Sequence, residues 1–216
     1  MTDGTILIDK PAGMTSFGVV ARIRRVLTEK QGKKVKVGHT GTLDPFATGL
    51  LILVVGKECK NAGKYSKLDK TYEATIRLGQ TSTTGDPEGE ITEVSGVKPS
   101  QAKIESTLKK FTGEITQKPP IYSAIKIGGR RAYKLARAGE EIEMPKRQVT
   151  VYSLEIVNYS YPVIKIKTRV SSGTYIRSLA EDIGRSLEVG AYCTQLRRTE
   201  IDKWNVDEAQ QLSDFL

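Results

Sequence analysis

The sequence is poor in the residues that metal centres and disulfide frameworks need. Its 216 residues include two cysteines, Cys59 and Cys193, and one histidine, His39. Two isolated cysteines do not make a spaced zinc motif, and a single histidine cannot complete an ordinary Cys/His site. The composition therefore predicts a reduced, cytoplasmic protein that needs no metal.

Long apolar runs are also missing. The longest wholly aliphatic run, at 50–55, is far shorter than the roughly 20 residues of a membrane-spanning helix. No basic segment followed by an apolar stretch opens the chain, as a secretory signal would. Membrane insertion and secretion are therefore disfavoured. Because no repeat, low-complexity tract or linker divides the sequence, we expect one monomeric domain over 1–216.

Positive charge is in excess and is unevenly distributed. The net charge is +9, with 13 basic and 6 acidic residues in 1–70 and 11 and 5 in 101–150. Clustered cations suit a polyanionic partner, because each neutralised phosphate releases counterions. Composition alone leaves DNA, RNA, anionic surfaces and plain solubility open.

Hydrophobic periodicity predicts intermixed strands and helices, which indicates an α+β fold. Aliphatic runs or alternation predict strands at 5–8, 50–55, 72–78 and 164–170. One helix should begin at Thr15 or Ser16 and another at Ser100. Their expected buried residues are Val19, Val20, Ile23, Val26 and Leu27 in the first, and Ile104, Leu108 and Phe111 in the second. A short helix should contain Ala209 and Leu212.

The Pro-bounded segment at 117–147 is predicted to be a basic, partly mobile arm. Lys126, Arg130 and Arg131 lie close in sequence to tyrosines. Such interleaving suits contact with an RNA backbone together with base stacking. A solvated helical hairpin with its tyrosines packed inside explains the same pattern equally well.

A glycine-rich stretch precedes the aliphatic run. Its glycines, Gly38, Gly41 and Gly49, predict tight turns, and a loop of this kind can hold a polar side chain at the edge of a core. Asp44 is the candidate for such a side chain. From the residues alone, an Asp-Pro pair is more commonly a turn former or helix cap, and no nucleotide-binding glycine motif is present.

The residues around Asp44 resemble the active-site motif of the TruB family of pseudouridine synthases. The matching residues are Gly-Thr-Leu-Asp-Pro at 41–45 and Ala-Thr-Gly at 47–49. Four further segments resemble the family's motifs in the same order. They are Leu-Ile-Asp-Lys-Pro at 7–11, Lys-Thr-Tyr at 70–72, Gly-Thr-Tyr-Ile-Arg-Ser-Leu at 173–179 and Gln-Leu-Arg-Arg-Thr at 195–199. Five motifs in series over nearly the whole chain are specific.

The resemblance implies the pseudouridine synthase fold, a mixed, mostly antiparallel central sheet flanked by helices and loops, with a basic cleft across it. It also implies isomerisation of uridine 55 to pseudouridine in the T arm of tRNA. The enzyme would flip the uridine out of its stack. Because bonds are exchanged within one nucleotide, no cofactor is chemically required.

The family motifs also imply roles for individual residues. Asp44 would be the nucleophilic carboxylate, attacking C1′ of the ribose or C6 of the uracil. Arg177 would pair with it. Tyr72 would stack on the uracil, ahead of any role in removing the C5 proton, since a phenol is a poor base. Tyr175 and Leu196 would form the wall of the pocket. His39 would fill or brace the space that the flipped base leaves, and Lys10 would contact a phosphate.

Ordinary structural roles fit these residues too. Tyr72, Tyr175 and Leu196 suit core packing, a lone histidine is usually structural, and an isolated arginine commonly lies on the surface or binds phosphate. A non-catalytic RNA-binding or tRNA-folding module is the main rival function. A sequence-specific DNA-binding protein is disfavoured, because no helix-turn-helix, zinc or basic-zipper pattern is present.

The sequence departs from the family pattern near its end. After Arg198 and Thr199 the family usually has a Gly-x-Phe-like turn, whereas this chain reads Glu-Ile-Asp-Lys-Trp at 200–204. Trp204 is expected to replace the aromatic residue. Family members commonly continue into a C-terminal RNA-binding domain of the PUA type, and we expect no such separate domain within 1–216.

Overall fold

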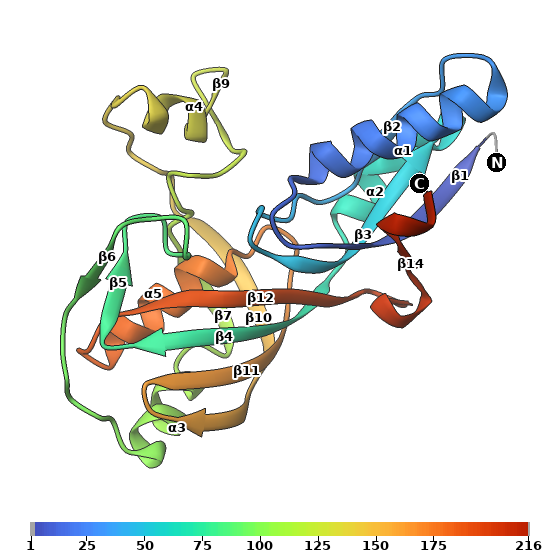
Figure 1. Cartoon of the computed structure of the whole chain (residues 1–216). Helices are drawn as coiled ribbons and strands as arrows, with labels where there is room; N and C mark the ends of the chain where they lie inside the picture. The colour runs from blue at the N-terminus through green and yellow to red at the C-terminus, as the bar shows by residue number, and fades with distance from the viewer. Residues whose placement is uncertain (1–2, 216) are drawn as a thin grey trace. The chain divides into compact units, whose positions relative to one another are not determined.

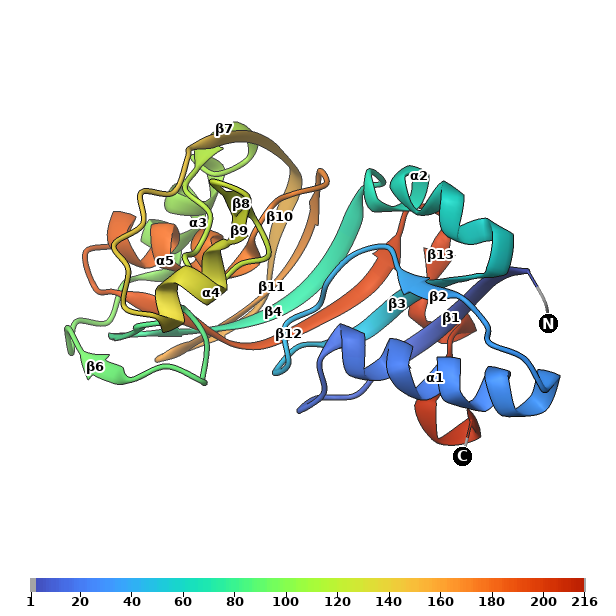
Figure 2. The ribbon, with the colours of Figure 1, turned by 90° about the horizontal axis from the view of Figure 1, so that it is seen from above.

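The computed structural model describes residues 3–215, which form two compact units. The first unit contains the chain up to Glu73 and the chain from Leu196 onward, and the second contains Ala74–Gln195. Figure 1 and Figure 2 trace the path by colour. Strands β4 (Lys70–Leu78) and β12 (Ala191–Ile201) cross the two boundaries, so each unit holds part of both strands.

The first unit is built on a mixed sheet in which β3 lies between β1 and β12. β1 (Gly4–Lys10) pairs antiparallel with β3 (Thr48–Val55), whereas β12 pairs parallel with β3 through Arg197↔Thr48 and Arg198↔Gly49. Three short strands complete this sheet: β2 (Val37–His39), β13 (Trp204–Asn205) and β14 (Gln210–Gln211).

Helix α1 (Ser16–Gln31) packs against the sheet of the first unit (Figure 1). It begins where Thr15 Oγ1 accepts a hydrogen bond from the Gly18 N–H at 2.9 Å, and it ends at Gly32, whose φ of 63° is left-handed. The predicted apolar stripe is confirmed except at Val26, which is only half-buried. The buried members are Val19, Val20, Ile23 and Leu27.

Strand β3 is buried on both faces. Leu51, Leu53 and Val55 pack in the cluster under α1, while Leu50 and Ile52 pack in a second cluster on the opposite face. The 3-10 helix η1 (Gly56–Asn61) and helix α2 (Ala62–Ser66) follow this strand. Each fully buried aliphatic side chain stabilises the fold by roughly 1.5–3 kcal/mol. The uninterrupted aliphatic run at 50–55 therefore forms the predicted central strand.

The predicted helix containing Ala209 and Leu212 is wrong. Ala209 is extended, with φ −84° and ψ 141°, and it separates two 3-10 helices, η2 (Val206–Glu208) and η3 (Leu212–Phe215). The intervening strand β14 pairs with β1 through Ile8↔Gln210 and Asp9↔Gln211. This pairing with residues 200 positions away overrides the local preference for a helix.

Trp204 packs in the first unit as an aromatic core residue. Its ring centroid lies 5.6 Å from that of Tyr65, and both rings border the cluster that contains Ile201 and Val206. A tilted aromatic pair of this kind adds to the stabilisation from ordinary apolar burial.

The second unit contains the remaining part of β4 followed in order by β11, β10 and β7. β10 (Arg147–Ser160) pairs antiparallel with both β11 (Val163–Val170) and β7 (Gly113–Gln117). β11 is buried at Ile164, Ile166, Thr168 and Val170 and exposed at Lys165, Lys167 and Arg169, which confirms the predicted alternation. A separate hairpin joins β5 (Gln80–Ser82) to β6 (Ile91–Glu93).

Two helices complete the body of the second unit, α3 (Gln101–Lys109) and α5 (Ile176–Ser186). Ser100 caps α3 as predicted, by accepting from the Lys103 N–H at 3.2 Å. Ile104 and Leu108 are buried, but Phe111 lies beyond the helix end and is half-buried. The mixed, mostly antiparallel α+β fold expected from the sequence is confirmed.

The segment 117–147 forms a small module of its own. It contains a two-stranded hairpin of β8 (Lys126–Ile127) and β9 (Arg130–Arg131), followed directly by helix α4 (Ala132–Arg137). Ile125, Ala132 and Met144 form its buried cluster. This core is small, and the basic side chains project away from it.

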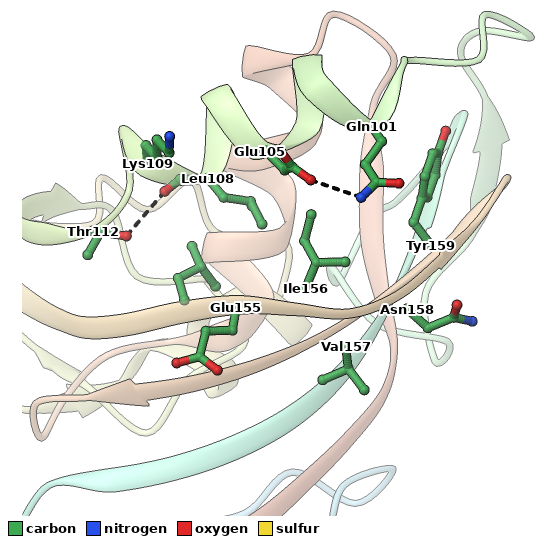
Figure 3. A pocket seen from close by; sticks show the side chains of 11 residues that line it. Gln101, Glu105, Leu108, Lys109, Thr112, Glu155, Ile156, Val157, Asn158 and Tyr159 are labelled. Atoms are coloured by element: carbon green, nitrogen blue, oxygen red, sulfur yellow. Dashed lines mark hydrogen bonds between the residues drawn. The ribbon is translucent and has the colours of Figure 1, made fainter.

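A groove of about 550 Å³ lies between α3 and β10 (Figure 3). Gln101 and Glu105 hydrogen-bond at its rim, and Ile156 and Tyr159 line its floor. None of the predicted site residues lines it. Within residues 3–215, no helix is long and apolar enough to cross a membrane.

Candidate functional site

Asp44 lies in the loop between β2 and β3 of the first unit. The loop is anchored just before this residue, because the Ser16 hydroxyl donates to the Leu43 carbonyl at 3.0 Å and accepts from the Leu43 N–H at 2.8 Å. The Ala47 N–H closes a turn onto the Asp44 carbonyl at 3.1 Å. Leu43 and Ala47 are buried while Asp44 is half-buried. The aspartate thus sits at the edge of the core on an anchored backbone.

Lys10 anchors the same loop from the other side. Its side chain is completely buried, and its ammonium donates to the carbonyls of Pro11 at 2.8 Å, Met14 at 2.6 Å and Pro45 at 3.2 Å. The Gly13 N–H also donates to the Pro45 carbonyl, at 2.8 Å. In this structure the Lys10 ammonium is directed at backbone oxygens, and the phosphate contact expected for it stays a prediction.

Tyr72 lies in the first unit at the start of β4, with its side chain 8% exposed. Its hydroxyl contacts Nη1 of Arg198 at 3.5 Å. Arg198 also donates through Nη2 to the carbonyl of Gly41, in the loop that carries Asp44, at 3.1 Å. Arg198 therefore connects Tyr72 to the Asp44 loop. Arg198 belongs to the Gln-Leu-Arg-Arg-Thr motif at 195–199, but no role was predicted for it.

Lys70 lies two residues before Tyr72 and is also buried, at 7% exposure. Its ammonium donates to the carbonyls of Ser66, at 2.7 Å, and Leu68. Burial, assisted by the positive charge of Arg198, lowers the pKa of Lys70 to about 8.

This lowered pKa predicts a pH dependence of stability. Between about pH 8 and the ordinary lysine pKa of about 10.4, the unfolded chain binds more protons at residue 70 than the folded chain does. The free energy of unfolding of the wild type should therefore rise with pH in this window relative to Lys70→Met, by on the order of 1 kcal/mol. Denaturant unfolding at pH 7.5, 9 and 10 measures the difference. Exposed Lys67→Met is the matched control, and parallel curves for the wild type and Lys70→Met would contradict the prediction.

His39 and Leu196 also belong to the first unit. His39 ends β2 opposite Leu53 of β3 and is half-buried, and Leu196 lies on β12 with 7% exposure. The next residue, Arg197, makes a bidentate ion pair with Asp9 at 2.8 and 3.0 Å. These positions are compatible with the substrate contacts expected for His39 and Leu196, which stay predictions.

Arg177 lies in the second unit, on the first turn of α5, and is 3% exposed. Its guanidinium donates to Asp86 Oδ2 at 3.0 Å, to the Thr84 carbonyl at 2.7 Å and to the Tyr122 carbonyl at 2.9 Å. Asp86 is itself held by the Thr84 hydroxyl and the Glu88 N–H. Asp86 lies in the turn between β5 and β6 and was not among the residues predicted for the site.

Tyr175 joins the second unit's helix α5 to the basic module. The side-chain amide of Gln117 accepts from the Tyr175 N–H at 2.8 Å and donates to the Tyr175 carbonyl at 3.0 Å. The Tyr175 ring packs against the cluster that contains Ile125 and Met144. The ring is half-buried. The position of the ring suits core packing and also a substrate contact, and the substrate contact stays a prediction.

The three residues predicted to contact the RNA backbone lie on the β8–β9 hairpin and are all exposed. Arg130 pairs with Glu140 at 2.8 Å, and Arg131 donates to the Ala124 carbonyl at 2.7 Å. An exposed ion pair of this kind contributes little stability and is easily exchanged for a phosphate. Lys126 is exposed on the neighbouring strand. In residues 3–215, no group of three or more His, Cys, Asp or Glu side chains is placed to hold a metal ion.

Comparisons with known proteins agree with the motif resemblance. Residues 24–176 match the family model described as TruB family pseudouridylate synthase (N terminal domain). Proteins named tRNA pseudouridine synthase B are 44% identical in Burkholderia lata and 43% identical in Thermobifida fusca, over 98% and 100% of this chain. The chain spans 64% of the first relative's length and 75% of the second's.

Solved structures show the same fold. A Cbf5-Nop10-Gar1 complex matches with a TM-score of 0.75 and 32% identity over 98% of this chain and 53% of that one. An H/ACA RNP bound to a substrate RNA containing 2′-deoxyuridine matches with a TM-score of 0.72 and 29% identity, over 98% of this chain and 51% of that one. The chain belongs to the TruB family of pseudouridylate synthases.

Proposed function

We propose that this protein isomerises uridine to pseudouridine in RNA and that its substrate is uridine 55 in the T loop of tRNA. The observation that carries the proposal is the anchored loop around Asp44, which a buried arginine connects to Tyr72. The relatives' name, tRNA pseudouridine synthase B, supports tRNA as the substrate class. The RNP with its bound substrate RNA supports RNA recognition by this fold.

The proposed reaction exchanges one glycosidic bond for another. The Asp44 carboxylate, ionised at neutral pH, attacks C1′ of the ribose or C6 of the uracil, and the bond between N1 and C1′ breaks. The base rotates and C5 bonds to C1′, the bond to Asp44 breaks and restores the free carboxylate, the C5 proton leaves and N1 gains a proton. Tyr72 stacks on the flipped uracil. We also propose that Arg177 pairs with Asp44, as the family motifs imply.

RNA recognition is assigned to the basic module at 117–147. Lys126, Arg130 and Arg131 are exposed and supply cations for the phosphates of the T arm. Half-buried Tyr175 and His39, with buried Leu196, are proposed to line the pocket for the flipped nucleotide. The enzyme is proposed to act as a cytoplasmic monomer without cofactor.

Release of tritium from C5-labelled uridine in a T-arm stem-loop tests the function, because C5 loses its hydrogen when it bonds to C1′. The wild type should release one tritium per pseudouridine formed, in EDTA and without added nucleotide. A stem-loop whose target uridine is replaced by cytidine, with label at its other uridines, is the control. Binding without any release would instead support a non-catalytic RNA-binding or tRNA-folding module.

A further inference from the structure

Arg198 is a buried cation shared by three segments of the first unit. Its side chain is 1% exposed. Nε donates to the Leu50 carbonyl at 2.8 Å, Nη2 donates to the Gly41 carbonyl at 3.1 Å, and Nη1 lies 3.5 Å from the Tyr72 hydroxyl. One planar group thus contacts β3, the Asp44 loop and β4. Only an arginine offers five donors in a fixed fork.

The surroundings of this cation are unusual for a residue that serves packing alone. All three oxygens around it are uncharged, and among residues 3–215 no carboxylate lies within 4.0 Å of its nitrogens. Burying a charge is costly unless it is paired, and an apolar side chain of similar volume commonly fills a core at lower cost. The arginine therefore has a use that an apolar residue would not serve.

One glycine makes room for the backbone of Arg198. A Cβ on Gly49, whose φ is 103°, would lie 2.2 Å from the Arg198 carbonyl oxygen, so only glycine allows β12 to approach β3 this closely. The backbone of Arg198 is thus fixed against β3 by the pairing with Gly49, and the guanidinium projects from a rigid base.

We propose that Arg198 is a positioning residue for the isomerisation, which sets the distance between the Asp44 loop and the Tyr72 ring. The inference rests on the proposed function. Gly41 lies three residues before Asp44, so a shift of its carbonyl moves the chain that carries the carboxylate. The Tyr72 hydroxyl contacts the same guanidinium. Misplacement of reacting groups by about 1 Å can cost about 10²-fold in rate.

The neighbouring Arg197 provides a matched control on the same strand. It carries the same charge, but it is 39% exposed in its side chain and forms an ion pair with Asp9. Its contacts include Thr48 but neither Tyr72 nor the loop carbonyl of Gly41. Arg197→Gln should therefore lower stability without lowering the rate of the chemical step.

The test measures single-turnover tritium release and the Kd for the T-arm stem-loop in Arg198→Gln, Arg198→Lys and Arg197→Gln. Arg198→Gln should slow the step by about 10²-fold and leave the Kd within about 3-fold, because positioning and not affinity is lost. Arg198→Lys should recover little of the rate, since an ammonium cannot reproduce the planar fork. The losses of rate in Arg198→Lys and Tyr72→Phe should be non-additive in the double variant Arg198→Lys/Tyr72→Phe, because both changes affect the same contact.

Hydrogen exchange over residues 40–47 measures the local stability of the Asp44 loop, and it tests the positioning role of Arg198 without an activity assay. Arg198→Lys, which retains the charge and is the safer variant for folding, should exchange faster there than Arg197→Gln at equal global stability. Equal rates and equal exchange in the two single variants would overturn the positioning role while leaving the function in place. A folded, RNA-binding wild type without tritium release would overturn the proposed function and this inference together.

Discussion

Replacing Asp44 by asparagine should abolish pseudouridine formation and leave RNA binding nearly intact. The amide keeps the size of the carboxylate but is no nucleophile, so the rate should fall by at least about 10⁴-fold, on the order of 5 kcal/mol in the barrier. The Kd for the T-arm stem-loop should change by less than about 3-fold, because the phosphate contacts that dominate affinity lie elsewhere. Single-turnover tritium release and filter binding measure the two quantities.

The matched control for Asp44→Asn is Asp207→Asn, an exposed aspartate in the same unit. It removes the same charge from the surface and should keep the wild-type rate. If Asp44→Asn still formed pseudouridine at a tenth of the wild-type rate or more, the nucleophile would have to be another group. If both variants bound RNA more tightly to the same extent, the loss of one negative charge would explain the change in affinity.

Arg177→Lys should impair turnover much more than binding. Arg177 donates to Asp86, the Thr84 carbonyl and the Tyr122 carbonyl from a site that is 3% exposed, and the ammonium of a lysine cannot reproduce the planar fork of nitrogens that makes these contacts. We expect kcat to fall by about 10²-fold or more, since a buried guanidinium fork that loses its geometry no longer fixes its neighbours. The Kd for the stem-loop should stay within about 3-fold, because this buried residue is not among the cations assigned to the RNA backbone.

Arg185→Lys on the same helix is the control for Arg177→Lys. Arg185 pairs with Asp182 at 2.8 Å, but its side chain is 77% exposed, so its replacement should change neither kcat nor the Kd. Equal losses of kcat and binding in Arg177→Lys would count against the assigned role. A normal kcat would show that the charge alone is sufficient at this position.

Those parts of the fold that depend on local pattern were predictable from the sequence. The run at 50–55 and the alternation at 72–78 formed strands as expected, because each pattern matches the burial of one element. The caps at Thr15 and Ser100 were also predicted, since a capping side chain bonds within its own first turn. The arrangement of these elements into one fold was predicted only from the resemblance to the TruB family.

The missed features depend on contacts between distant segments. Arg198 meets Gly41 across 157 positions, and Arg177 meets Asp86 across 91, so no local pattern indicates either contact. Lys10 is completely buried and donates to three backbone carbonyls, one of them that of Pro45 in the Asp44 loop, and no local pattern indicated this burial. Ala209 was expected in a helix but lies beside β14, which pairs with β1. Tertiary pairing decided each of these positions.

The division of the chain has a consequence for biosynthesis. Residues 74–195 form one uninterrupted segment, so the second unit can fold as soon as it has left the ribosome. The first unit cannot finish until residues after 195 are made, because β12 and β14 are missing from its sheet until then. The segment after residue 195 brings Arg198 to the loop of Asp44. A nascent chain arrested before residue 196 would therefore contain an ordered second unit while its first unit stays incomplete.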